Sequence, residues 1–313
     1  MKIKEFPKIF AIGARYTEGI FDGEVEITEK VDGSSFAFGL LNGELQMRSK
    51  GRCIYPESVD KLFYEAVHYV TSIQNGLVDN TVFYCEYLQK NKHNVLKYDR
   101  VPTNHLILFG VAHYTTEGNI SFFTQEYETL SLWASSIGIE AVPCLYAGTL
   151  CGGTTISGSE LITTLLDRQS VLGGTKIEGV VVKNYAKDVL CGDIVFPIMA
   201  GKYVSEAFKE VHRKASEGAP VRGHSWEAFC ESFRTEARWQ KAVQHLREDG
   251  LLLGEPKDIG GIIARVKQDI REEEINLFTS VWPELTDQLL RVAIRGIPEW
   301  WKEKILNGST GLD

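Results

Sequence analysis

The sequence predicts an α+β protein, in which antiparallel sheets with flanking helices are followed by a small all-α domain. Residues 24–114 contain β-branched and aromatic runs separated by turn residues, whereas residues 225–313 show helical periodicity almost throughout. Between these regions, Ala215–Pro220 is rich in small residues and ends in proline, as linkers do. We therefore expect a first domain over residues 1–214, a linker over 215–224 and a helical domain over 225–313.

The first domain is predicted to start with antiparallel strands. Val25, Ile27 and Val31 precede a Gly-Ser-Ser turn, and Asn42-Gly43 is a strong hairpin signal between apolar runs. Further along, apolar residues at helical spacing predict helices, and β-branched runs predict strands. The expected helices cover residues 57–73, 124–137 and 158–167, and the expected strands cover 81–88, 105–114 and 177–185.

The second domain is expected to consist of helices alone. From Ser225 to Gly250, an apolar stripe that includes Trp226, Phe233 and Trp239 recurs at helical spacing. Three more helices are expected at 259–270, 277–290 and 298–305. We expect Trp300 and Trp301 to belong to the core of this domain.

Composition places the chain among globular proteins. It has 313 residues, 43% of them hydrophobic, a formal net charge of -8 and six scattered cysteines. It has no apolar run near 18 residues and no signal-peptide pattern at its start. We expect a cytoplasmic monomer without a membrane partner. The acidic balance argues against indiscriminate coating of nucleic acid, although a local basic groove remains compatible with it.

Lys30 lies in the most informative stretch, Glu29–Ser35, which contains the pattern Lys-x-Asp-Gly. In this pattern a lysine amine attacks the α-phosphate of a nucleotide and keeps the nucleotidyl group as a phosphoramidate. The attacking amine must be unprotonated, although a free lysine has a pKa of about 10.4. Such chemistry also needs cations or Mg²⁺ to neutralise the phosphate, carboxylates to hold the metal, and an aromatic face for the base.

Further segments supply these groups in order along the chain. A basic turn, Arg48-Ser49-Lys50-Gly51-Arg52, is suited to a phosphate. Glu86 interrupts an apolar strand, where a glutamate is rarely buried without purpose. Phe109 offers an aromatic ring on the next strand. The segment from Glu178 to Lys183 then provides a second carboxylate and a second lysine, and Lys202 follows.

Together these segments resemble the covalent nucleotidyltransferase superfamily, which includes ATP-dependent DNA and RNA ligases and mRNA capping enzymes. The resemblance covers residues 5–214. It implies that Lys30 is the nucleophile and that Lys183 and Lys202 act with it in catalysis by stabilising charge on the α-phosphate. It implies a nucleotide site made by Glu29, Lys30, Asp32, Gly33, Arg48, Glu86, Phe109, Glu178, Lys183 and Lys202. Glu86, Glu178 and Asp32 are the implied metal ligands.

The chain departs from the family pattern at three positions. Ala200 stands where the closing motif often has a first lysine, so this motif offers Lys202 alone. Gly110 follows Phe109 where an acidic residue is common. Ser35 stands where some RNA ligases carry asparagine.

The expected helical tail distinguishes among members of this superfamily. DNA ligases and capping enzymes normally carry an OB-fold after the last motif, and that fold needs five strands. A helical domain instead resembles the nick-sealing RNA ligases typified by phage T4 RNA ligase 2. NAD-dependent ligases have an additional domain before the nucleophile, and 29 residues precede Lys30 here. The resemblance therefore favours ATP, with Mg²⁺ or Mn²⁺, as cofactors.

The expected activity is ATP-dependent sealing of RNA ends that carry a 3′-hydroxyl and a 5′-phosphate, in a nicked duplex during RNA repair. We expect Arg48, Lys50, Arg52, Lys90 and Lys92 to contact the nucleic acid. Three alternatives stay open: a DNA ligase with an atypical tail, a capping-type guanylyltransferase, and a non-catalytic nucleotide- or RNA-binding protein. The Pro7-Lys8-Ile9 segment is expected to pack over the adenosine.

Overall fold

The computed structural model describes residues 1–59, 61–150, 158–191, 194–196, 198–205, 233–273 and 290–308. The chain divides into two compact units, Met1–Ser205 and Glu206–Asp313. The expected linker at 215–224 and nearly all of the expected helix at 277–290 lie outside the described residues. The domain boundary after residue 214 therefore stays a prediction.

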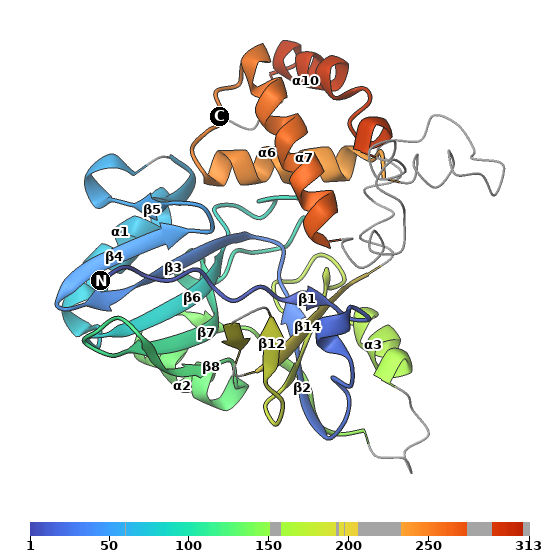
Figure 1. Cartoon of the computed structure of the whole chain (residues 1–313). Coiled ribbons are helices and arrows are strands. Elements are labelled where there is room, and N and C mark those ends of the chain that lie inside the picture. Colours follow the sequence, from blue (N-terminus) through green and yellow to red (C-terminus); the bar gives the residue numbers. More distant parts are fainter. Residues whose placement is uncertain are drawn as a thin grey trace. The chain divides into compact units, whose positions relative to one another are not determined.

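The first unit contains a seven-stranded sheet (Figure 1). Along the sheet, the strands are β5 (Cys53–Ile54), β4 (Glu44–Ser49), β3 (Ser34–Leu41), β6 (Thr81–Tyr87), β7 (Leu106–Tyr114) and β8 (Ile120–Thr124). These neighbours pair antiparallel, and β9 (Glu140–Ala141) adds to β7 in parallel. The predicted hairpin at Asn42-Gly43 is confirmed, since both residues have the positive φ that such turns require.

Two helices cover one face of this sheet. The ring of Phe63, just before α1 (Tyr64–Ile73), stacks on Phe36 of β3. Trp133 of α2 (Tyr127–Ser136) meets Phe83 of β6 edge to face. Burial of these rings and their neighbours fixes which face of the sheet points inward and leaves the opposite face for other contacts.

A five-stranded sheet completes the first unit. Its order is β1 (Phe10–Ala11), β14 (Met199–Val204), β11 (Gly179–Asn184), β2 (Glu24–Lys30) and β10 (Cys144–Thr149). The β1–β14 pair is parallel and the others are antiparallel. Ile162 and Leu165 of α3 (Gly158–Leu166) pack with Ile27 and Val182 on one face. Because side chains alternate along strands, Lys30 belongs to the opposite face.

Shorter elements connect these parts. The hairpin of β12 (Val189–Cys191) and β13 (Ile194–Phe196) lies between β11 and β14 in the sequence. Single turns of 3₁₀ helix in the first unit cover Arg15–Thr17, Pro56–Ser58, Lys61–Phe63, Gln74–Gly76 and Thr103–His105, and one in the second unit covers Pro256–Asp258.

The chain's first nine residues, Met1–Ile9, form a strap that crosses the open face of the seven-stranded sheet and leads into β1 (Figure 1). Side chains of the sheet hold its backbone. Arg48 Nη1 donates to the carbonyl of Ile3 at 3.0 Å, and Tyr84 Oη donates to that of Lys4 at 3.1 Å. The Phe6 ring packs at 5.1 Å from the Tyr84 ring centre. The strap is thus fixed by hydrogen bonds at its start and by apolar contact at its middle.

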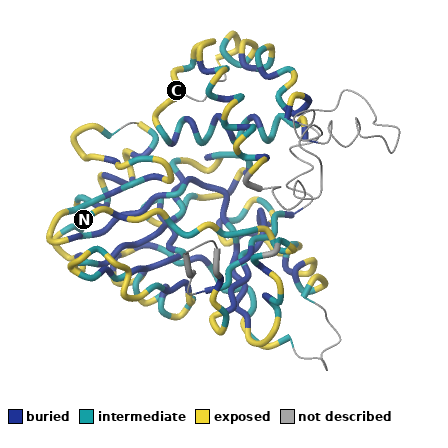
Figure 2. Tube along the Cα trace, in the orientation of Figure 1, coloured by how far each residue is buried: buried dark blue, intermediate teal, exposed yellow. Residues whose placement is uncertain are grey.

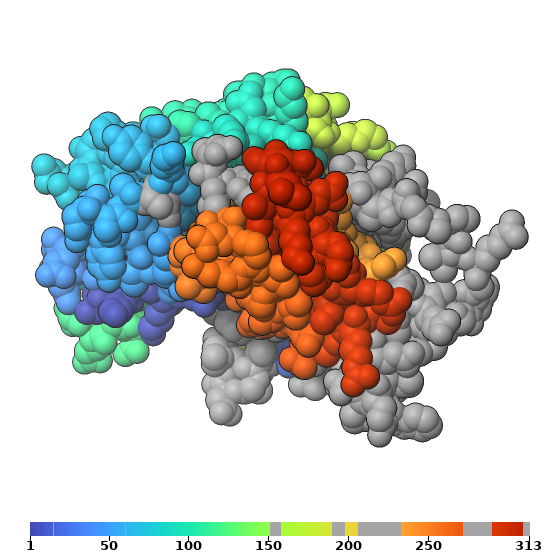
Figure 3. Space-filling view, turned by 90° about the horizontal axis from the view of Figure 1, so that it is seen from above, coloured from blue at the N-terminus to red at the C-terminus, as the bar shows by residue number. Residues whose placement is uncertain are grey.

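The second unit is built from α6 (Glu236–Glu248), α7 (Ile259–Glu273) and α10 (Ile297–Leu306) in its described part. In Figure 3 the atoms of α7 and α10 lie against one another. Trp239 and Trp301 are the large core side chains, and each indole N–H donates to a backbone carbonyl. The expectation that Trp301 is a core residue is confirmed, since it is 1% exposed.

Figure 2 shows the buried residues concentrated along the strands of the two sheets. In the part of the chain that the structure describes, no helix combines the length and the apolar character needed to span a membrane.

Candidate active site

Lys30 is the last residue of β2, and the cross-strand register brings Glu178 to it. Lys30 pairs with Gly179 at the start of β11. The Lys30 ammonium lies 2.7 Å from both Oε1 and Oε2 of Glu178. The side chain of Glu178 is 6% exposed and that of Lys30 is 29% exposed, so the pair faces a partly open space.

Gly179 permits this arrangement. A Cβ atom there would lie 2.1 Å from the carbonyl oxygen of Tyr203 on β14. Any other residue would therefore push β11 away from β14 and disturb the register between Glu178 and Lys30.

The charges around Lys30 keep it protonated in the free protein. Burial lowers the pKa of Lys30, but the negative charges of Glu178, Glu86 and Asp32 outweigh burial and raise this pKa above its ordinary value. Burial raises the pKa of Glu178 to about 7, against the opposing charges of Lys30 and Lys202. The amine therefore becomes a nucleophile only when new positive charge enters the site or the carboxylate takes a proton.

Glu86 approaches Lys30 from the other sheet. Its Oε1 accepts a hydrogen bond from the backbone N–H of Gly33 at 3.1 Å. A Cβ atom on Gly33 would come within 2.7 Å of the Glu86 side chain and of the Tyr87 carbonyl oxygen. The glycine of the Lys-x-Asp-Gly pattern thus lets the nucleophile turn pack directly on the strand that carries Glu86.

Asp32 is buried and engaged with the backbone of a loop. One of its carboxylate oxygens accepts the N–H groups of Val95 and Leu96, each at 2.9 Å, and the other receives the Asn94 amide at 3.4 Å. Within the described ranges, no three His, Cys, Asp or Glu residues form a ready metal cluster. Mg²⁺ commonly binds one or two carboxylates together with phosphates and water, which fits Glu86 and Glu178 better than Asp32.

Lys202 lies on the same sheet face as Lys30. It pairs with Val181 on β11, which pairs in turn with Thr28 on β2. Its positive charge also lowers the pKa of Glu178, as expected for a lysine on the same side of the site. Lys30, Glu86, Glu178 and Lys202 therefore gather around one space.

Lys183 belongs to a second cluster on this face. It lies four residues, or about 13 Å, along β11 from Gly179, which pairs with Lys30. Its ammonium donates to Glu26 Oε1 at 2.9 Å and to the backbone carbonyl of Gln125, and its side chain is 1% exposed. Glu26 also accepts from Tyr185 Oη and from the N–H of Tyr127. Glu26 is not among the site residues expected from the sequence, although Glu26 and Lys30 are four residues apart on one strand and so share a face.

Two other expected nucleotide-site residues have partners elsewhere. Glu29 points to the face opposite Lys30, where it accepts hydrogen bonds from Ser170 Oγ and the N–H of Val171. The guanidinium of Arg48 donates to the carbonyl oxygens of Ile3, Ser49 and Lys50. Arg48 therefore serves the strap in this structure.

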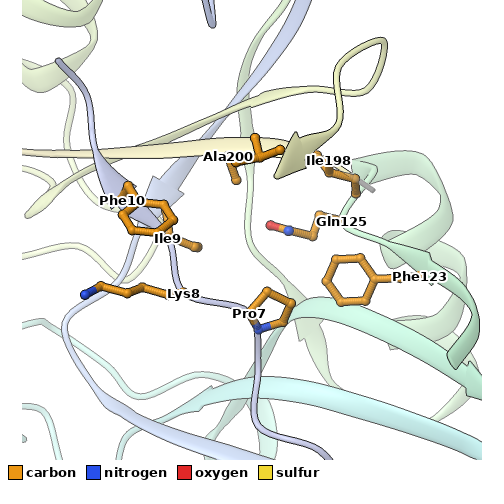
Figure 4. Close-up of a pocket in the computed structure, with 9 residues that line it drawn as sticks. Pro7, Lys8, Ile9, Phe10, Phe123, Gln125, Ile198 and Ala200 are labelled. Carbon is orange, nitrogen blue, oxygen red and sulfur yellow. The ribbon is translucent and has the colours of Figure 1, made fainter. Parts of the chain in front are cut away.

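The Phe109 ring is in contact with the strap. Phe6 meets it edge to face, with ring centres 4.8 Å apart. Beside this contact, strap residues cover a pocket between the two sheets, in which the buried Gln125 side chain lies (Figure 4). Its walls include Pro7, Ile9, Phe10, Phe123 and Ala200. Ala200, where a lysine is common in the family pattern, lines this pocket.

The expected nucleic-acid contacts are mostly at the surface. Lys50, Lys90 and Lys92 are exposed, and Arg52 is half-buried beside the turn after β4. None of them is among the groups whose charges act on the pKa of Lys30.

The model of a protein family described as RNA ligase matches residues 23–198. The chain belongs to the RNA ligase family. The matched region contains the Lys30, Glu86 and Glu178 cluster. No curated protein matches the chain.

Solved structures give more distant similarities. The Naegleria gruberi RNA ligase with PPi is 18% identical, with a TM-score of 0.47, over 68% of this chain and 58% of that one. A mutant of that ligase with ATP and Mn has the same identity and TM-score. A putative ATP-dependent DNA ligase from Aquifex aeolicus is 17% identical, with a TM-score of 0.44, over 97% of this chain and 68% of that one. The chain thus spans about three fifths of the length of the Naegleria ligase.

Proposed function

We propose that this member of the RNA ligase family is an ATP-dependent enzyme that joins 3′-hydroxyl and 5′-phosphate RNA ends through an adenylate on Lys30. The observation that carries the proposal is the Lys30–Glu178 pair with both oxygens at 2.7 Å. A lysine held at the end of a strand, partly open to solvent and surrounded by Glu86 and Lys202, has what a phosphoryl-directed nucleophile needs.

In the first step, the lone pair of the Lys30 amine attacks the α-phosphorus of ATP. A phosphorus–nitrogen bond forms, the bond to the bridging oxygen breaks, and pyrophosphate leaves with the electron pair. The amine first loses its proton, and Glu178 is the nearest acceptor at 2.7 Å. Burial raises the pKa of Glu178, so it accepts a proton more readily than an exposed carboxylate would. Positive charge brought in with the nucleotide would lower the pKa of Lys30 and so favour the loss of its proton.

Lys202 and the two glutamates are assigned supporting roles. Lys202 would stabilise charge on the α-phosphate, since it lies near Glu178 on the same sheet face. Glu86 and Glu178 would hold Mg²⁺ or Mn²⁺, which supplies positive charge to the phosphates and to the lysine. We assign Lys183 to shaping the nucleotide site through its ion pair with Glu26.

The strap is assigned to the base of ATP. Pro7, Ile9 and Phe10 form one side of the pocket in Figure 4, and Phe123 and Gln125 form the other. Apolar walls with one carboxamide suit a flat heteroaromatic ring. The Phe109 ring contacts Phe6, which precedes Pro7 of this pocket, and we assign it as the platform for adenine.

The later steps use the RNA. An oxygen of the 5′-phosphate attacks the adenylate phosphorus, and the bond to Lys30 breaks, which returns the amine. The 3′-hydroxyl oxygen then attacks the 5′-phosphate phosphorus, and AMP leaves. We assign adenylyl transfer to residues 1–214 and nucleic-acid binding to the helical domain, Arg48, Lys50, Arg52, Lys90 and Lys92. A nicked RNA duplex in repair is the proposed substrate, as for the phage T4 RNA ligase 2 type. Monomeric state and cytoplasmic location stay predictions.

The test is covalent labelling followed by sealing. Wild-type protein with α-labelled ATP and Mg²⁺ or Mn²⁺ should retain label after denaturation, and Lys30→Ala should not. The charged protein should then seal nicked duplexes with RNA at the nick. Label that persists in Lys30→Ala would remove the nucleophile assignment. Sealing of DNA nicks alone would favour a DNA ligase, and labelling by GTP alone would favour a guanylyltransferase.

A further inference from the structure

The nucleophile turn is tied to one loop by several side chains. Lys30 ends β2 of the five-stranded sheet, and Ser34 begins β3 of the seven-stranded sheet. Val31–Gly33 is therefore the crossing between the two sheets. The placement of Lys30 relative to Glu86, which belongs to the second sheet, depends on how this crossing is held.

The loop Gln89–Tyr98 holds Asp32 and Gly33 of this crossing by hydrogen bonds. Asp32 accepts the N–H groups of Val95 and Leu96, and its own N–H donates to Tyr98 Oη at 2.9 Å. The Asn94 amide donates to the carbonyl of Gly33 at 2.7 Å. These bonds fix the middle of the turn.

His93 fixes the end of the turn, at Ser34. The backbone N–H of Gln89 donates to His93 Nδ1 at 3.0 Å, so Nδ1 carries a lone pair. The ring proton is then on Nε2, which donates to Ser34 Oγ at 2.8 Å. His93 is 9% exposed and Ser34 is 1% exposed, so water does not readily replace this bond.

We propose that His93 is a positioning residue for adenylyl transfer. Its Nε2–H holds Ser34, and through Ser34 the position of the Lys30 turn against Glu86. The proposal rests on the proposed function, because it concerns the rate at which Lys30 attacks ATP. A displacement of about 1 Å at a reacting group can cost a factor of about 100 in rate.

The experiment measures single-turnover formation of the enzyme adenylate and, separately, ATP affinity. His93→Ala should slow adenylyl transfer at saturating ATP by about 10- to 100-fold. ATP affinity should change little, since His93 is not in the proposed nucleotide site. His93→Gln keeps an N–H donor for Ser34 and should recover most of the rate. His93→Asn keeps an acceptor for Gln89 but is too short to reach Ser34, so it should stay slow. Ser34→Ala should match it.

His113 is the matched control. Like His93, it hydrogen-bonds a side-chain hydroxyl, in this case that of Thr81 on the neighbouring strand, with Nδ1 3.0 Å from Thr81 Oγ1. His113 lies outside the nucleophile turn. His113→Ala should leave the adenylylation rate close to wild type. The inference is overturned if His93→Ala transfers at the wild-type rate, or if His93→Gln and His93→Asn are equally slow.

Folding and function failures are told apart within the same set. If His93→Ala does not fold, as judged by circular dichroism, the Gln and Asn variants and Ser34→Ala decide the question. If the wild-type protein forms no adenylate, the proposed function fails. If the wild type is labelled and all His93 variants form the adenylate at the wild-type rate, the positioning role alone fails.

Discussion

Replacing Glu178 by glutamine should lower the pKa of the Lys30 ammonium by about two units, since 1.36 kcal/mol corresponds to one unit. In the wild type, both carboxylate oxygens lie 2.7 Å from Nζ. A glutamine keeps the size and one hydrogen-bond acceptor but removes the charge. The burial that lowers the pKa of Lys30 would then meet less opposition.

The magnitude follows from the distance and the exposure. Two unit charges at this separation attract by about 6 kcal/mol at an effective dielectric constant near 20. The Lys30 side chain is 29% exposed, and Glu86 and Asp32 still favour the ammonium. Because of this exposure and these remaining charges, we halve the attraction to about 3 kcal/mol, which corresponds to a fall of about two units in the pKa of Lys30.

The assay is the pH dependence of Lys30 modification by a small amine-reactive reagent, read by peptide mass spectrometry in the absence of ATP. Glu178→Gln should react at lower pH than wild type and yet form less adenylate, because a metal-binding carboxylate is gone. Asp167→Asn, which breaks an exposed pair with Lys176, is the control and should leave Lys30 unchanged. A Lys30 titration in Glu178→Gln that coincides with that of wild type would refute the reasoning.

Three further outcomes follow from the same geometry. Burial raises the pKa of Glu178 to about 7, so its neutral acid form accumulates below that pH. Because the neutral acid binds a metal ion poorly, the initial adenylylation rate at limiting Mg²⁺ should rise as the pH increases through about 7. A rate that does not change with pH would contradict the role of Glu178 in metal binding. Lys183→Met leaves Glu26 buried without its counter-ion and should lower the free energy of unfolding by about 3–5 kcal/mol, as measured by denaturant unfolding. The double variant Lys183→Met with Glu26→Gln should regain much of the lost stability. Equal stability of Lys183→Met and wild type would exclude an energetic role for the pair. Arg48→Ala removes a charged hydrogen bond worth about 1.5–3 kcal/mol to the Ile3 carbonyl, so amide exchange in the strap should accelerate; unchanged exchange means that other contacts hold it.

Patterns local in sequence predicted strands close to β6, β7 and β11, the Asn42-Gly43 turn, and the tail helices α7 and α10. They did not indicate β8 or β10. The order of Lys30, Glu86 and Glu178 also indicated which groups would gather, because Lys30 and Glu86 lie on strands and Glu178 directly precedes one, each with clear apolar neighbours. The partners of Lys183 and Arg48 could not be read in this way. The contacts of Lys183 with Glu26 and of Arg48 with Ile3 join residues more than forty positions apart in the sequence, and short-range periodicity carries no information about such pairs.

The direction of a side chain was also harder to predict than its position. Glu29 is adjacent to Lys30 and so must point to the other face of the strand, as alternation alone requires. Asp32 follows a strand end, where alternation no longer applies, and its loop partners come from residues 94–96. The family resemblance placed Glu29, Lys30 and Asp32 in one nucleotide site, whereas in the structure their side chains have different partners.

The pairing of Lys30 with Glu178 has a consequence during synthesis. The two residues are 148 positions apart. At about 5–20 residues per second, roughly 7–30 s pass between the emergence of the lysine and that of its carboxylate. Until then the growing chain has an amine without its counter-ion and lacks the Lys202 strand with which β1 pairs. Under the proposed function, the site around Lys30 is therefore complete only after β14, the strand that carries Lys202, has been made.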